Sequence, residues 1–297
     1  MSDASQHPIL ATSGIRSIIG ALALAAAIGA PVQAQSPGGS PNQGAITFSG
    51  GLDAPTVYFF RGILQEGDPK ITLWPAGDLR VALAKGDGGL KSVAVHVGVW
   101  NSLHTGTAGT GGPLNKLHYQ EDFYTTLDLG LSHGLGIATT FVARTSPNGS
   151  FDSITELDIK VAKSGRIAPY GMVAFELSNT GQADGGSRRG TYLELGAAPS
   201  AAFPLARARL TVPVKVGLSV RNYYELLNND LTYRDRAFGF FDIGGHIAIP
   251  ISSATSRFGE WNVHGGADLM TLGDTTRVFN RGDRIRVVGL IGIGVTY

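Results

Sequence analysis

Apolar residues recur at every second position through most of this chain, and this period restricts the folds open to it. In the last segment Ile285, Val287, Ile291 and Ile293 share one parity, while glycine, threonine and arginine occupy the other. Successive side chains of a β-strand point to opposite faces, so such a segment has one apolar face and one polar or small face. The pattern predicts an all-β protein.

Twelve stretches carry this alternation. They span residues 45–63, 71–85, 91–102, 117–131, 135–145, 151–163, 166–178, 188–198, 207–221, 237–251, 258–272 and 283–297. Most are long enough to cross a bilayer when tilted, which takes about 9–11 residues, whereas strands of globular proteins average about 5–6. The first stretch is the least regular, because Pro55 interrupts it and its parity shifts between Phe48 and Phe60. We predict a bulge there.

The connections between these stretches alternate in length. The second, fourth and sixth are tight turns at residues 86–90, 132–134 and 164–165, whereas the third, seventh, ninth and eleventh are long, at 102–116, 178–188, 221–236 and 272–284. Outer-membrane barrels have short periplasmic turns, longer outside loops and, in bacteria, an even number of strands. The sequence therefore predicts an antiparallel transmembrane β-barrel of about 12 strands over residues 45–297. Both chain ends should lie on the short-turn side.

The N-terminus has the features of an export signal. Arg16 precedes an uninterrupted apolar or glycine run at residues 18–30, Pro31 ends it, and small residues follow up to Ala34. This order is typical of a secretory signal peptide, and the run is too short for a transmembrane helix. We predict a signal peptide at residues 1–34, cleaved after Ala34, and a flexible leader at residues 35–44, which are rich in Ser, Pro and Gly.

Composition excludes several classes of function. The chain has no cysteine, so disulfide scaffolds, thiolate metal sites and thiol chemistry are absent. Its formal net charge is +1, which gives no strong field for binding nucleic acid. Charged residues make up only 16% of the chain, against about 25% in an average protein. A membrane barrel fits this low share.

Strand parity assigns a set of ionisable side chains to the interior of the predicted barrel. The predicted pore-lining residues are Asp78, Arg80, His96, Asp128, Arg144, Glu156, Asp158, Lys160, Glu176, Glu194, Arg209, Lys215, Asp242, His246, Glu260, His264, Asp268 and Arg286, with Asp122 on the same parity. Acidic residues outnumber basic ones. Such a lining can sort solutes by charge and size, or its members can pair and fill the interior. Both interpretations remain open.

Other chemistry has little support in the sequence. His246 and His264, with nearby carboxylates, could form a two-histidine metal site, but no tight ligand spacing favours one. A lipid-cleaving enzyme would need a serine beside a histidine on the lipid side. By parity His96, His118, His246 and His264 all point inward. The outward parity holds Tyr119, Phe123, Trp261 and Tyr297 near strand ends, as expected for interfacial aromatic girdles.

Two short segments resemble a known family. Residues 57–66 (VYFFRGILQE) and 97–102 (VGVWNS) are similar to the start of the TorF-like family of outer-membrane porins, whose members carry an Arg-Gly-Ile-x-Gln segment and then a Gly-x-Trp-x-Ser segment. The resemblance implies a small barrel in the outer membrane and no catalytic residues. The loop at 102–116 has no clear counterpart in the family. Tyr297 resembles the terminal aromatic residue that such proteins present to the barrel-assembly machinery.

These observations predict a passive channel in a Gram-negative-type outer membrane. Its expected partners are outer-membrane lipid, the barrel-assembly machinery and small hydrophilic solutes, with no cofactor, metal, nucleic acid or enzymatic activity. One alternative is a barrel with a closed lumen whose extracellular loops bind a partner. Another is a soluble exported β-sandwich, which would also show alternation.

Overall fold

The computed structural model describes residues 44–66, 71–178, 188–203, 207–251 and 258–297. The predicted signal peptide at residues 1–34 lies outside these ranges, as does the predicted leader apart from Gly44.

Almost all of the regular secondary structure in the described residues is β-strand. Its elements are β1 (Ile46–Pro55), β2 (Tyr58–Phe60), β3 (Ile63–Glu66), β4 (Thr72–Lys85), β5 (Leu90–His104), β6 (His118–Leu131), the 3-10 turn η1 (Ser132–Gly134), β7 (Leu135–Thr145), β8 (Ile154–Lys163), β9 (Pro169–Glu176), β10 (Thr191–Ala197), β11 (Ser200–Ala202), β12 (Arg209–Thr211), β13 (Val214–Arg221), β14 (Glu225–Leu227), β15 (Tyr233–Asp235), β16 (Phe238–Pro250), β17 (Glu260–Leu272), α1 (Asp274–Phe279) and β18 (Ile285–Thr296). Within these ranges, no helix is long and apolar enough to cross a membrane.

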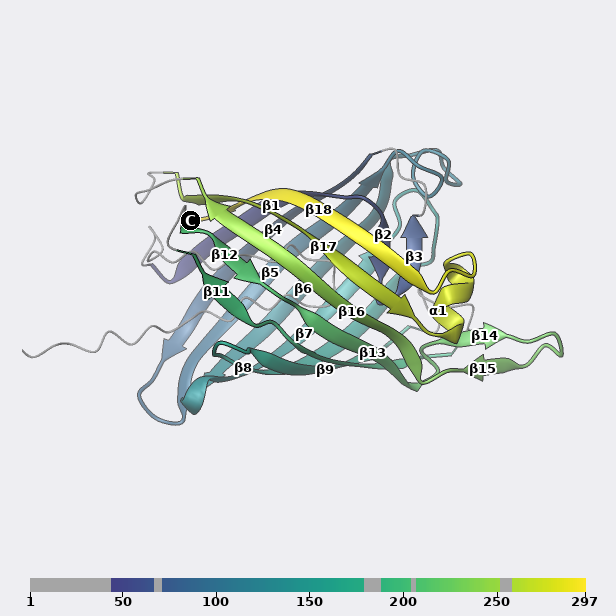
Figure 1. The fold of residues 1–297 in the computed structure, drawn as a ribbon. Helices are drawn as coiled ribbons and strands as arrows, with labels where there is room; N and C mark the ends of the chain where they lie inside the picture. Colours follow the sequence, from purple (N-terminus) through teal and green to yellow (C-terminus); the bar gives the residue numbers. More distant parts are fainter. Residues whose placement is uncertain (1–43, 67–70, 179–187, 204–206, 252–257) are drawn as a thin grey trace, which may run out of the picture.

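One antiparallel sheet forms the wall of a closed barrel (Figure 1). Neighbouring strands pair in chain order from β4 to β10, β1 pairs with β4 and β18, and β16 joins β17 to β13. Because β11 continues β10 and β12 leads into β13, the fourteen strands of this sheet occupy twelve positions around the barrel. The predicted fold class is confirmed. A closed sheet also rules out the β-sandwich.

Prolines account for the two interrupted wall strands. Pro199 separates β10 from β11, and Pro213 separates β12 from β13. Proline has no N–H to donate to a ladder, so it breaks the regular pairing. The carbonyl groups of both prolines still accept hydrogen bonds across the gap, from the N–H groups of Val212 and Gly244 at 2.9 Å each. The barrel therefore stays closed at both breaks.

The first predicted strand, residues 45–63, is wrong in its second half. β1 ends at Pro55, and β2 and β3 form a separate two-stranded sheet that has no ladder with the wall. Arg61 and Gly62 join them with φ angles of 46° and 81°, the left-handed values that tight hairpin turns require. A Cβ atom on Gly62 would lie 2.7 Å from the Phe240 ring. The parity shift thus marks a hairpin, not a bulge in a continuing strand.

The two faces of the wall differ as the alternation predicts. The outward face carries exposed aliphatic and aromatic side chains such as Leu79, Phe141, Ile243 and Ile291. The inward face carries most of the charges. The connections also sort by end: residues 86–89, 132–134 and 164–168 are at one end, and the longer 105–117 and 222–237, together with 56–66, are at the other. These two ends are called the short-turn end and the long-connection end below.

A substitution on each face tests this assignment. Ile243→Arg should lower the free energy of unfolding by about 2–4 kcal/mol, the cost of arginine near the middle of a lipid-facing strand. His246→Arg is the matched control, because His246 lies on the same strand, faces inward and contacts the Asp268 carboxylate at 2.9 Å. Denaturant unfolding in detergent-lipid micelles measures both. Equal losses would mean that the outward face does not meet lipid.

Candidate functional site

The interior of the barrel holds the predicted residues. Cross-strand partners share a face, and by this criterion all eighteen predicted pore-lining residues, from Asp78 on β4 to Arg286 on β18, project inward. They do not form one continuous lining. Those near the long-connection end are buried in a hydrogen-bonded layer, and those toward the short-turn end form smaller, partly exposed groups.

The hairpin of β2 and β3, residues 58–66, inserts an arginine into this layer. Arg61 Nη1 donates hydrogen bonds to Glu156 Oε1 and to the Tyr223 hydroxyl, each at 2.8 Å. Its Nη2 lies 3.5 Å from Asp158 Oδ2, and its guanidinium carbon lies 4.5 Å from the centre of the Tyr192 ring. The Arg61 side chain is 1% exposed. The hairpin that follows β1 in the sequence is therefore held by acidic side chains of β8 and by the Tyr192 ring of β10.

A second buried arginine ties three wall strands together. Arg144 on β7 donates to Asp122 Oδ2 on β6 at 2.5 Å and to Glu156 Oε2 on β8 at 2.7 Å. Glu156 therefore accepts hydrogen bonds from both Arg61 and Arg144. Asp122 also accepts a hydrogen bond from Gln120 at 2.8 Å. Asp122 and Glu156 are tolerated at this depth because each accepts hydrogen bonds from a guanidinium and from a second donor.

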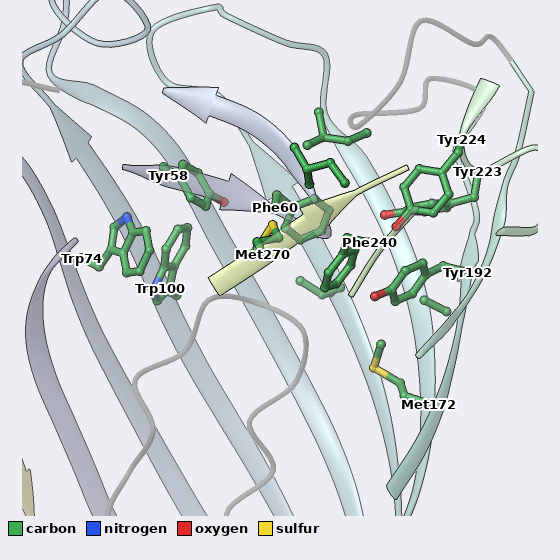
Figure 2. Close-up of a cluster of buried hydrophobic side chains, with 14 of the residues drawn as sticks. Tyr58, Phe60, Trp74, Trp100, Met172, Tyr192, Tyr223, Tyr224, Phe240 and Met270 are labelled. Carbon is green, nitrogen blue, oxygen red and sulfur yellow. The ribbon is translucent and has the colours of Figure 1, made fainter. Parts of the chain in front are cut away.

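Aromatic rings fill the space on both sides of the hairpin. Figure 2 shows Tyr58 beside Trp74 and Trp100, with Phe60 nearer to Phe240 and Tyr192. The Tyr58 ring centre lies 5.2 Å from that of Trp74 and 5.7 Å from that of Trp100. Both tryptophans and the tyrosine are 6% exposed or less. At this level the inward side chains of the described wall strands pack against the hairpin and leave it little contact with water.

A serine, a histidine and a glutamate meet at the edge of this layer. Ser102 Oγ is hydrogen-bonded to His104 Nε2 and accepts a hydrogen bond from Trp74 Nε1 at 2.8 Å. His104 Nδ1 lies 3.8 Å from Glu66 Oε2, and the histidine ring stacks on Tyr119. All these side chains point inward and are buried. A buried serine capped by an indole N–H packs the hairpin against β5; it is not open to a substrate.

Smaller ion pairs occupy the half of the interior nearer the short-turn end. His96 lies 3.0 Å from Asp78, and His246 lies 2.9 Å from Asp268. Their side chains are 12–19% exposed, in contrast to those of the buried layer. Lys215, whose side chain is 37% exposed, lies 3.8 Å from Asp242. These groups are polar and, apart from the buried Asp242, partly exposed.

The two histidines of the possible metal site have separate partners. His246 pairs with Asp268, whereas His264 lies 2.7 Å from Asp53 and 2.9 Å from Asn262. Within the described residues, no three His, Cys, Asp or Glu side chains group as metal ligands would. Asp53 is an inward residue that the predicted set lacks. The irregular parity of the first stretch hid it.

His118 and Tyr119 differ from their predicted directions. The register between β5 and β6 shifts at Ser102/Leu103, and His118 pairs with Leu103 and bonds to Asn101 at 2.9 Å. Asn101 is on the outward parity of β5, so His118 belongs to the outer face. Tyr119 is buried inside, where its hydroxyl donates to Gln65 at 2.6 Å. A bulge adds one residue and reverses the facing of those beside it, so neither prediction holds.

Arg61 is the most important interior residue outside the predicted set. The predicted first strand, residues 45–63, includes Arg61 because the apolar residues on both sides of it, Phe59-Phe60 and Ile63-Leu64, look strand-like. Gly62 permits a two-residue turn between Phe59-Phe60 and Ile63-Leu64, but Arg61 is not among the residues that usually mark such a turn. The sequence therefore contains only a weak signal of the hairpin, and none of its position inside the barrel.

These features define a twelve-stranded β-barrel with a polar interior and an inserted hairpin. No protein-family model and no curated protein matches the sequence. Among solved structures, the chain is similar to the NanC porin (10% identity, 85% of this chain and 99% of that one, TM-score 0.40) and to the transport unit of the autotransporter AIDA-I from Escherichia coli (10%, 85% and 89%, 0.42). It is also similar to the translocator domain of the autotransporter NalP from Neisseria meningitidis (12%, 86% and 89%, 0.39).

Proposed function

We propose that this chain is an outer-membrane channel for passive diffusion of small hydrophilic solutes, and that the hairpin of β2 and β3 forms its constriction. The observation that carries the proposal is the difference in side-chain exposure between the two halves of the barrel interior. A polar, partly exposed half adjoins a layer closed by a hairpin that shares no ladder with the wall. Among the described contacts, side chains such as that of Glu156 and the Tyr224 hydroxyl hold Arg61 in this layer, so displacement of the hairpin would break no ladder of the barrel wall.

The membrane location rests on the wall itself. Its outward face is apolar over strands of ten or more residues, such as β5 and β16. Closure leaves no unpaired edge, as a hydrocarbon environment requires. With the short turns on the periplasmic side, the long-connection end faces outward from the cell. The predicted signal peptide, cleaved after Ala34, would supply the export that this location needs.

The family resemblance supports the same proposal. The two segments that resemble the TorF-like porins meet in space: the first forms the hairpin, and the second contributes Trp100 and Ser102 beside it. The terminal Tyr297 continues the pairing of β18 with β1, through reciprocal hydrogen bonds with Phe48 at 2.7 Å. We propose that this paired C-terminal strand is what the barrel-assembly machinery recognises.

Planar-bilayer recording of the refolded protein tests the channel. We expect small, ohmic currents with a weak preference for cations, because acidic side chains outnumber basic ones on the inward face. The double variant Asp78→Asn/Asp268→Asn should shift the reversal potential toward anions, since both carboxylates are in the partly exposed half. Asp87→Asn, in a turn outside the lumen, is the control. A shift of equal size in the control would contradict the proposed pathway.

A barrel with a closed lumen that binds a partner through its long connections is the second candidate. The near-complete burial of Trp100, Arg144 and Tyr192 favours it, as does the hairpin of β14 and β15, which projects well beyond the barrel (Figure 1). Absence of current at every voltage, from protein that folds normally, would make this the better account.

A further inference from the structure

A hollow outside the lumen lies at the long-connection end. Arg236, Phe238, Asp274 and Arg284 line it, together with Ala237 and Gly273. Its volume is about 320 Å³, and it is open to solvent. The proposed channel makes no use of this hollow.

The charges around it are unbalanced. The Asp274 carboxylate accepts a hydrogen bond from Arg284 at 2.9 Å and lies 3.8 Å from Arg277 and 3.9 Å from Arg236. The hydrogen bond from Arg284 lowers the pKa of Asp274, so this carboxylate remains ionised at neutral pH. One negative charge faces three guanidinium groups. The cluster therefore has capacity for a further anion.

The segment that carries Asp274 is anchored to the rest of the fold. Thr275 Oγ1 donates to the Tyr224 carbonyl at 3.0 Å, and Thr276 Oγ1 donates to the Gly239 carbonyl at 2.5 Å. Gly273 N–H donates to the same Gly239 carbonyl at 2.7 Å. Both threonines are buried. These contacts fix α1 above β16, and the hollow does not have to be assembled when a ligand arrives.

The floor of the hollow belongs to the apolar outer face. Phe238 pairs with Leu218 on β13 through a bulge, which turns its ring outward, and the side chain is 40% exposed. Ile285, next to Arg284, is 62% exposed on β18, which β17 separates from β16. Arg236 and Arg284 therefore lie at the edge of the apolar outer face. A ligand with an anionic group joined to an acyl chain would match both parts.

We propose that this hollow binds a phosphate group of an outer-leaflet glycolipid, with Arg236 and Arg284 holding the phosphate and Phe238 contacting the acyl region. Arginine suits phosphate because its planar fork can donate two parallel hydrogen bonds to two oxygens. The proposed lipid site is on the outside of the barrel at its long-connection end, and it is separate from the lumen. Its test therefore uses lipid binding, a readout that does not depend on whether the lumen conducts.

The experiment measures lipid bound to the full-length mature chain, purified in a non-ionic detergent, by native mass spectrometry. The probes are bis-phosphorylated lipid A, the same lipid without its phosphates, and inorganic phosphate as a competitor. Arg236→Gln/Arg284→Gln should weaken binding of the phosphorylated lipid by about tenfold or more, as expected for loss of charge-assisted hydrogen bonds. Lys85→Gln/Arg166→Gln removes two exposed positive charges at the short-turn end and should leave binding unchanged.

Three results would overturn the proposal. Equal binding of the dephosphorylated lipid would show that phosphate is not recognised. Equal weakening in the control variant would show that only net charge matters. Displacement of the lipid by millimolar inorganic phosphate would show that the hollow takes the free anion and that Phe238 adds nothing. Heat-dependent gel migration of each variant confirms that it has folded.

Discussion

Replacing residues 57–66 with a short Gly-Ser linker should convert a barrel of small conductance into one that passes several times more current. The linker removes the hairpin of β2 and β3 and leaves both flanking strands complete. Asp53 on β1 pairs directly with Trp74 on β4, so a short connection spans the gap. Without Tyr58, Phe60 and Arg61, the layer between the polar half and the long-connection end loses its central side chains.

A point substitution separates the role of Arg61 from that of the whole hairpin. Arg61→Gln removes the positive charge that Glu156 and Asp158 share, so the two carboxylates repel each other and the hairpin loses its main attachment to β8. We expect more frequent openings than in the unmodified protein, at a conductance below that of the linker variant. Arg166→Gln, in a short turn, serves as the control. Both currents are recorded in planar bilayers.

Unchanged conductance after removal of the hairpin would contradict its role as the constriction. The side chains of the wall, such as Trp100 and Phe240, would then close the lumen by themselves, and the closed-lumen candidate would be preferred. Collapse of the barrel in the linker variant can be distinguished from closure, because an unfolded barrel loses the difference in gel migration between heated and unheated samples.

Arg144→Met should lower the free energy of unfolding by about 3–5 kcal/mol, the cost of leaving a buried charge without its partner. Glu156 keeps Arg61 at 2.8 Å, so the carboxylate that loses its guanidinium is Asp122. Asp122→Asn/Arg144→Met should therefore recover most of the loss, since an amide can remain buried beside Gln120 without a counter-charge. Denaturant unfolding of the refolded barrel measures both variants.

Arg80→Met is the matched control for this cycle. Arg80 on β4 also faces inward, but its side chain is only partly buried and is therefore accessible to solvent. Its replacement should cost about 1 kcal/mol or less, as for solvent-screened charges. A single Arg144→Met loss no larger than this, or a double variant as unstable as the single one, would mean that Asp122 does not depend on Arg144.

The alternation alone predicted most of the wall. The ends of β4, β6, β7 and β17 agree with the predicted stretches to within one or two residues. Period two is a local property of the backbone, and it also assigns each side chain to a face wherever the register is regular. This is why the inward positions of residues such as Lys215 and Asp268 could be read from the sequence, while His118 and Tyr119, beside a bulge, could not.

The partners of those inward residues were not predictable in the same way. Arg61 and Glu156 are 95 positions apart, and His264 and Asp53 are 211 apart. No local pattern relates them. They meet because the sheet closes on itself and the first long connection folds inward, which decides which charges face one another across the interior.

The sequence by itself determined the strand class, the face of most side chains and the contrast between short and long connections, because these depend on neighbouring residues. Only the tertiary structure decided that the segment around Arg61 leaves the wall and enters the lumen. Pro55 and the Arg61-Gly62 turn permit a hairpin, but they do not place it. Burial of its aromatic rings against Trp74, Trp100 and Phe240, and the pairing of Arg61 with Glu156, place it there.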